Sequence, residues 1–164
     1  MRRLLILGAA ALLVTACQKP AAEERSASPA AAPAASDAEA IVAAAEKSWA
    51  SGDVAQVMAN YADDAVVFDS SRLAATNDRN LITRGNADFL TMKPADFVVA
   101  DRQTQALDDN TIVSSGVLSF TASVGAARDV MRTRFTQVYQ RQADGAWKIV
   151  HEHMSSPPAG TPLP

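Results

Sequence analysis

The sequence predicts an α+β domain in which about three helices precede a curved antiparallel sheet. Two observations carry this prediction. Apolar residues recur at helical spacing between residues 37 and 61, and long alternating polar and apolar stretches fill most of residues 97–154. Turn-forming residues such as Asp108, Asp109 and Asn110 separate those stretches. Helices grouped before strands, rather than alternating with them, are typical of the α+β class.

The helical part is expected to begin at Ser36 or Asp37, because either residue caps a helix N-terminus well. Gly52 is expected to end the first helix, and Asp53 to cap a second one. The inward face of these two helices is expected to consist of apolar residues at helical spacing: Ile41, Val42, Ala45, Trp49, Val54, Val57, Met58 and Tyr61.

The remaining elements are expected to be mainly strands, since apolar and polar residues alternate along them. A short third helix is expected over residues 85–92, closed by Pro94, and residues 70–84 are expected to be irregular. The expected strands cover residues 65–69, 97–107, 111–124, 129–141 and 147–154.

The first 16 residues have the pattern of a lipoprotein signal peptide and are set aside from the fold. Two arginines are followed by an apolar segment, residues 4–14, which is shorter than the roughly 20 residues a membrane-spanning helix needs. The sequence VTAC at residues 14–17 resembles a lipobox, which ends in the cysteine that is lipidated. Cys17 is therefore predicted to be the lipidated first residue of the mature protein. The alternatives are an ordinary secretory signal with a leftover thiol, and twin-arginine export.

The predicted organisation is a signal peptide at 1–16, a lipidated Cys17 with a disordered tether to residue 36, one domain at 37–156, and a disordered tail at 157–164. The tether is rich in Ala, Pro and Ser and lacks aromatic and branched aliphatic residues, so it cannot form a core. The acyl chains would bind the lipid bilayer and place the protein in the cell envelope. In a Gram-negative host, Gln18 favours the periplasmic face of the outer membrane.

Charge excludes one class of partner. Without the two arginines of the signal peptide, the 18 acidic residues outnumber the basic ones, and no basic cluster occurs. Nucleic-acid binding needs clustered Lys and Arg, so no nucleic-acid partner is expected. No cofactor fingerprint occurs either, and none is expected.

Several blocks of the sequence resemble the nuclear transport factor 2-like superfamily. They are Gly52 with Asp53, the segment YADDAVVFD at 61–69, Gly85, and the segment DGAWKIVHEH at 144–153. This superfamily includes ketosteroid isomerases, SnoaL-like polyketide cyclases and the association domain of calcium/calmodulin-dependent kinase II. The resemblance implies a cone-shaped domain whose curved sheet and covering helices enclose a pocket, and it implies a homodimer.

The resemblance also implies site residues. The general base of the ketosteroid isomerases corresponds to Asp69, although Asp69 can equally be a strand-end residue that accepts backbone hydrogen bonds. The tyrosine of their oxyanion hole falls on Ala45, and the second donor falls on Gln137. Losing one oxyanion donor costs on the order of a hundredfold in rate, so steroid isomerisation is not expected.

The pocket implied by the resemblance is small and mostly apolar, with Asp69, Gln137 and Glu152 as its polar groups. Glu152 is expected either to contact a ligand or to lie near the rim in water. The side chains of His151 and His153 share a strand face but lack a third ligand, so no metal site is expected. The other pocket residues expected are Trp49, Tyr61, Phe135, Tyr139, Val150 and Met154.

The functional expectation is an envelope lipoprotein whose domain binds a small hydrophobic ligand or acts as a dimeric interaction module without catalysis. The alternative is an isomerase, cyclase or dehydratase that uses Asp69 to move a proton on a hydrophobic carbonyl compound, without a cofactor. A third possibility is a structural dimer with a collapsed pocket. An open pocket lined by Asp69 favours catalysis, and a pocket filled by Trp49, Phe135 and Met154 favours binding or structure.

Overall fold

The computed structural model describes residues 33–158 and residue 160. The predicted signal peptide, Cys17 and the tether up to residue 32 therefore lie outside the described residues, as do residue 159 and residues 161–164 of the predicted tail. No helix within the described part of the chain is long and apolar enough to span a bilayer.

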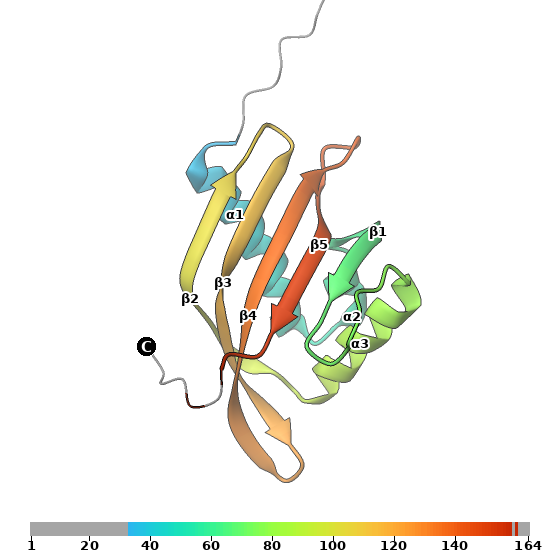
Figure 1. Cartoon of the computed structure of the whole chain (residues 1–164), viewed down its shortest axis with the longest axis vertical. Helices are drawn as coiled ribbons and strands as arrows, with labels where there is room; N and C mark the ends of the chain where they lie inside the picture. The colour runs from blue at the N-terminus through green and yellow to red at the C-terminus, as the bar shows by residue number, and fades with distance from the viewer. Residues whose placement is uncertain (1–32, 159, 161–164) are drawn as a thin grey trace, which may run out of the picture.

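The fold is α+β, as predicted, with helices packed on one face of a five-stranded sheet (Figure 1). The strand order is β1-β5-β4-β3-β2; β1 runs parallel to β5, and every other neighbouring pair is antiparallel. The elements are α1 (Ala35–Glu46), the 3₁₀ helix η1 (Lys47–Ser51), α2 (Val54–Met58), β1 (Tyr61–Phe68), α3 (Arg79–Thr91), β2 (Ala95–Ala106), β3 (Thr111–Val124), β4 (Ala127–Arg141) and β5 (Trp147–Ser155).

The first helix differs from its expected start. Ala34 occupies the N-cap position and makes no side-chain cap, so the expectation of a cap at Ser36 or Asp37 is wrong. Asp37 instead lies in the first turn, where its carboxylate is favoured by the helix dipole. Gly52 ends the following 3₁₀ turn in a left-handed conformation with φ 70°, and Asp53 caps α2 by accepting from the Ala55 amide at 2.8 Å.

The third helix begins six residues earlier than the sequence suggests, at Arg79 rather than Gly85. The Asp78 side chain accepts from the amides of Asn80 and Leu81 and so satisfies two of the unpaired donors at the helix N-terminus. The part of residues 70–84 that follows Asp78 is therefore helical, and α3 is long enough to cover one end of the sheet (Figure 1).

Strand β1 also begins earlier than expected, at Tyr61 rather than Ala65. It pairs in parallel with β5, and Tyr61 lies opposite Ile149. A register shift follows Tyr61, so the pairing resumes at Val66 opposite His151. Parallel pairing between the first and last strands depends on contacts distant in sequence, which local pattern does not reveal.

Irregularities bend the sheet around its inner face, the face toward the helices. Strand β2 contains two register shifts, and Asp96 and Asp101 there have positive φ values of 55° and 50°. On β3, Gly116 lies opposite Phe135, and an added Cβ would come within 3.0 Å of the Ala100 carbonyl and 3.2 Å of the Phe135 ring. Glycine at this position therefore lets the Phe135 ring lie close against the sheet.

Candidate functional site

A cavity of about 460 Å³ lies between α3 and the inner face of the sheet. This volume falls in the range of roughly 300–1,000 Å³ typical of small-molecule sites. Its deeper wall is formed by buried side chains, and its rim by exposed ones such as Ser70, Ser71 and Ser156. The apolar members of the deeper wall are Trp49, Val67, Ile82, Leu118 and Phe120.

Helix α3 forms one wall because four of its lining residues share one face. Ile82, Gly85, Asn86 and Phe89 follow the helical spacing i, i+3, i+4 and i+7. Phe89 packs edge-to-face on Phe120 of β3, with ring centroids 5.2 Å apart. Gly85 leaves the middle of this wall open.

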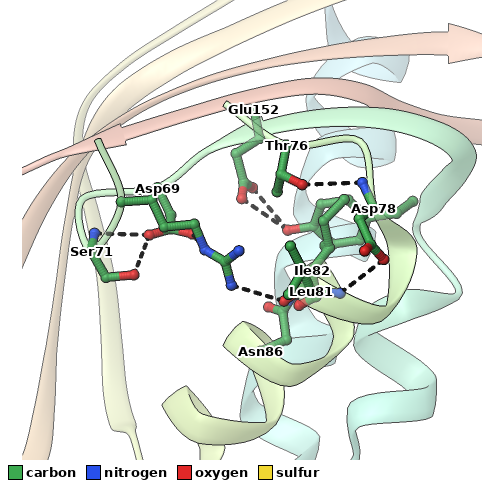
Figure 2. A network of polar contacts seen from close by, with 10 residues as sticks. Asp69, Ser71, Thr76, Asp78, Leu81, Ile82, Asn86 and Glu152 are labelled. Atoms are coloured by element: carbon green, nitrogen blue, oxygen red, sulfur yellow. Dashed lines mark hydrogen bonds and ion pairs between the residues drawn. The ribbon is translucent and has the colours of Figure 1, made fainter. Parts of the chain in front are cut away.

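A buried carboxyl group forms the polar part of the opposite wall. Glu152 of β5 is only 4% exposed, and its carboxylate accepts from the Tyr61 hydroxyl, which lies 3.0 Å from both oxygens (Figure 2). Tyr61 is placed by the first position of β1, next to Ile149 on β5. The Glu152 carboxyl group thus reaches the cavity from the sheet and is held by a phenol from the neighbouring strand.

A second donor holds the same carboxylate from behind the cavity wall. The Gln137 side-chain amide donates to Glu152 Oε2 at 2.6 Å, and its carbonyl oxygen accepts from the Tyr139 hydroxyl at 2.7 Å. Gln137 is fully buried, so both ends of its amide need these partners. We call Tyr139, Gln137, Glu152 and Tyr61 the polar chain.

Burial dominates the proton affinities of the polar chain. The pKa of Glu152 is raised by desolvation, and the Asp69 charge adds to this, although hydrogen bonds from Gln137 and Tyr61 act in the opposite direction. Burial and the Glu152 charge also raise the pKa of Tyr61 well above its usual value, so Tyr61 remains a neutral donor. Glu152 is therefore the group of the polar chain whose protonation responds to what enters the cavity.

Asp69 follows β1 and lines the cavity near its rim. Its Oδ1 accepts from the amide of Ser71 at 2.8 Å and also from the Ser71 hydroxyl, while its Oδ2 pairs with Arg72 Nε at 3.1 Å (Figure 2). Arg72 in turn donates to the Leu81 carbonyl at 3.1 Å, tying this turn to α3. Both carboxylate oxygens of Asp69 are thus already engaged, an arrangement that suits a structural role more than a free base.

A family model described as SnoaL-like domain matches residues 38–160. The chain belongs to the SnoaL-like family. The cone-shaped fold expected from the resemblance is confirmed, because solved structures of the same architecture match most of the SnoaL-like domain. No curated protein matches the chain in sequence.

Three solved structures illustrate the likeness. A protein from Xanthomonas campestris, described as a candidate calcium/calmodulin-dependent protein kinase II association domain, is 29% identical, with 81% of this chain and 96% of that one covered at a TM-score of 0.69. A candidate ketosteroid isomerase from Parabacteroides distasonis is 23% identical (74% and 89% covered, TM-score 0.62). A protein of unknown function in nutrient uptake from Rhodospirillum rubrum is 18% identical (74% and 98% covered, TM-score 0.62). The last two likenesses show the fold alone.

The SnoaL-like domain brings five of the nine residues expected at the site to the cavity: Trp49, Tyr61, Asp69, Glu152 and Met154. Gln137 and Tyr139 lie behind its wall in the polar chain. Phe135 is buried against Gly116 instead of lining the cavity. The assignment of all these residues as ligand contacts stays a prediction.

Val150 is the remaining expected residue, and it does not line the cavity. A register shift between Val138 and Tyr139 on β4 sets Ile149 opposite Tyr139, and His151 opposite Val138. Ile149 therefore takes the buried place beside Tyr139, and Val150 stays half-buried outside the cavity lining.

His151 and His153 are exposed on the outer face of the sheet, the face away from the helices, and the His153 ring lies 5.1 Å from that of Phe68. Within residues 33–158, no three potential metal-ligating side chains come together.

The cavity wall formed by α3 was not predicted from the sequence, because the third helix was expected to begin only at Gly85. The i, i+3, i+4, i+7 spacing from Ile82 to Phe89 is the signal that could have revealed the longer helix and its inner face.

Proposed function

We propose that this chain is a membrane-anchored envelope lipoprotein whose SnoaL-like domain binds a small, largely apolar ligand. The cavity between α3 and the sheet is the observation that carries the proposal. It is of ligand size, its deeper wall is apolar, and the Glu152 carboxyl group gives it one buried polar contact. Trp49 and Met154 line this space without filling it, which by itself favours catalysis, but Asp69, the candidate base, is engaged by Ser71 and Arg72.

A second candidate function is proton transfer on a bound carbonyl compound. The surroundings of Glu152 favour it, because burial raises the pKa of this carboxyl group, and such a group can accept and donate a proton inside the cavity. Asp69, the base implied by the resemblance, is held by Ser71 and Arg72. If mass spectrometry detects chemical conversion of the bound ligand, the function is catalysis and not binding alone.

We expect Gly85→Leu to abolish ligand binding while leaving the domain folded. A Cβ at Gly85 would meet only Arg72 Nη2, at 3.8 Å, so a leucine can enter the cavity and occupy it. Leucine also has a higher helix propensity than glycine, by roughly 0.8 kcal/mol. Native mass spectrometry of residues 33–164 should show a co-purified ligand on the wild type and none on this variant.

Arg84→Leu is the matched control, since it places the same side chain on the exposed neighbouring position of α3. It is expected to retain the ligand. Equal ligand occupancy in Gly85→Leu and the wild type, with both proteins folded, would contradict binding in this cavity.

Pairing of two copies through the outer face of the sheet is the second part of the proposal. No helix of the described chain covers this face (Figure 1), and half-buried valines from three strands lie on it. The Xanthomonas campestris protein is described as an association domain, which favours an assembly role. The valines are Val66, Val113, Val117 and Val138.

We expect residues 33–164 to sediment as a dimer at micromolar concentration, and Val113→Glu to shift the protein to monomer. The cross-strand neighbours of Val113 are Gln105 and Val138, so a charge there would lose its hydration in the interface without gaining a cationic partner on its own sheet. Val124→Glu, at the end of the β3–β4 hairpin, adds the same charge at an exposed position and should remain dimeric. A wild-type monomer at this concentration would count against the dimer.

A further inference from the structure

The polar chain surrounds a carboxyl group with hydrogen-bond donors but supplies no positive charge. Tyr61 and Gln137 both donate to Glu152, and neither is charged. Three ion pairs, Arg72 with Asp69, Arg79 with Asp63 and Arg102 with Glu46, do not include Glu152. Buried carboxylates are ordinarily paired with a cation, so Glu152 is an exception that calls for an explanation.

We propose that the missing charge is supplied by the ligand, which is an organic cation: an amine with an apolar body whose ammonium group binds the Glu152 carboxylate. This inference rests on the ligand-binding function proposed above and specifies the chemistry of the ligand. Glu152 Oε1 accepts only from Tyr61, whereas Oε2 accepts from both Tyr61 and Gln137. A carboxylate has about four acceptor positions, so Oε1 retains capacity for an ammonium donor.

The donors around Glu152 are oriented to stabilise its ionised form once a cation binds beside it. The Gln137 carbonyl oxygen is occupied by the Tyr139 hydroxyl, which leaves its amide nitrogen facing Glu152 as a donor. The Tyr61 hydroxyl lies equally far from both carboxylate oxygens, as a donor shared between them does. Hydrogen bonds of this kind favour the ionised form, which burial alone disfavours. An incoming ammonium group would remove that conflict.

The rest of the cavity is compatible with a single positive charge. Three carboxyl groups line it, from Asp69, Asp88 and Glu152, against two guanidinium groups, from Arg72 and Arg132. Asp69 is already neutralised by Arg72. The lining therefore carries one excess negative charge when Glu152 is ionised, and a monocationic ligand balances it.

Aromatic residues complete the match. Trp49, Tyr61, Phe89 and Phe120 all line the cavity, and they offer apolar contact area for the ligand body. Aromatic rings also attract ammonium groups through their π-electron density, an effect that grows when the cation is desolvated. An apolar amine thus finds both a counter-ion and an apolar enclosure in the same space.

Amine binding should release a proton. In the free protein, burial and the Asp69 charge raise the pKa of Glu152, and a bound ammonium would lower it again. The titratable groups that interact with Glu152 are Tyr61 of β1, Asp69 of the turn after it and Tyr139 of β4. The other charged groups in the cavity lining are Arg72, Asp88 of α3 and Arg132 of β4. Amine affinity should therefore increase with pH as free Glu152 ionises, and decrease only when the amine itself loses its proton.

The test compares two ligands of matched size by isothermal titration calorimetry: phenethylamine, which is cationic at neutral pH, and phenethyl alcohol, which is neutral. We expect the wild type to bind the amine roughly tenfold or more tightly than the alcohol, as is typical of a close buried charge pair. Titrations in two buffers of different ionisation enthalpy should show proton release for the amine only. Asp64→Asn, which removes an exposed carboxylate outside the cavity lining, should keep the preference.

Glu152→Gln should lose the preference for the amine and retain binding of the alcohol, because the amide still accepts from Gln137 and carries no charge. If this variant does not fold, the comparison of the two ligands on the wild type still tests whether the cavity prefers an amine. Equal affinity of the wild type for the two ligands would overturn the amine assignment and leave the binding function intact. Failure of both ligands to bind would instead contradict the binding function itself.

Discussion

Replacing Gln137 with leucine is expected to lower the free energy of unfolding by about 2–4 kcal/mol. Gln137 is fully buried and connects Glu152 to Tyr139. Leucine has a similar size but no polar group, so the Tyr139 hydroxyl would lose its acceptor and the Glu152 carboxylate would keep only Tyr61. Each buried polar group left without a partner costs roughly 1–3 kcal/mol. Urea denaturation of residues 33–164 measures the change.

Gln140→Leu is the control, because Gln140 lies on the same strand with an exposed side chain. Its effect should stay within about 0.5 kcal/mol, as is usual for surface positions. If the two variants prove equally stable, the polar chain contributes nothing measurable to the fold. In that case its hydrogen bonds would have to be explained by function alone.

The second large effect concerns the N-terminus. We expect Cys17→Ala to move the protein from the membrane fraction to the soluble fraction, because the variant lacks the residue that would carry the predicted acyl chains. Each buried methylene of an acyl chain contributes about 0.8 kcal/mol to membrane binding, so two or more chains hold a protein stably on the bilayer. A protein without acyl chains loses this contribution. Fractionation of cells followed by immunoblotting measures the distribution.

Mass spectrometry of the mature protein gives an independent reading of the same prediction. The wild type should carry the mass of the acyl groups on Cys17, and the variant should lack it. Ser26→Ala, a similarly small change within the predicted tether, should leave both the mass of the lipid and the membrane location unchanged. An unaltered mature mass and location in Cys17→Ala would contradict lipid anchoring.

Local sequence pattern predicted the elements whose contacts are local. The alternation in β3, β4 and β5 is visible in the sequence, and so is the helical spacing before Gly52. The early starts of β1 and α3 were missed for different reasons. Strand β1 is extended by its parallel pairing with β5, more than 80 residues away along the chain. The start of α3 depends on the Asp78 cap, which is one of several polar residues in that region able to begin a helix.

The candidate site was predicted in part. The family resemblance implied Gln137 and Glu152 as pocket residues, and both are buried opposite one another on β4 and β5. The resemblance fails at Val150, because the register shift beside Tyr139 changes which residue turns inward. The pairing of Asp69 with Arg72 depends on the fold of a turn, and no pattern in the sequence announces it.

The bends in β2 have a consequence for how copies of the protein meet. Among the strands of residues 33–158, β2 is the last of the sheet and has one side without a strand partner, where another chain can add by backbone hydrogen bonding. Its two bulges interrupt a continuous ladder, and Asp96 and Asp101 place charges at those interruptions. Copies gathered on a membrane by the predicted lipid anchor would therefore be expected to resist open-ended, amyloid-like stacking through this strand.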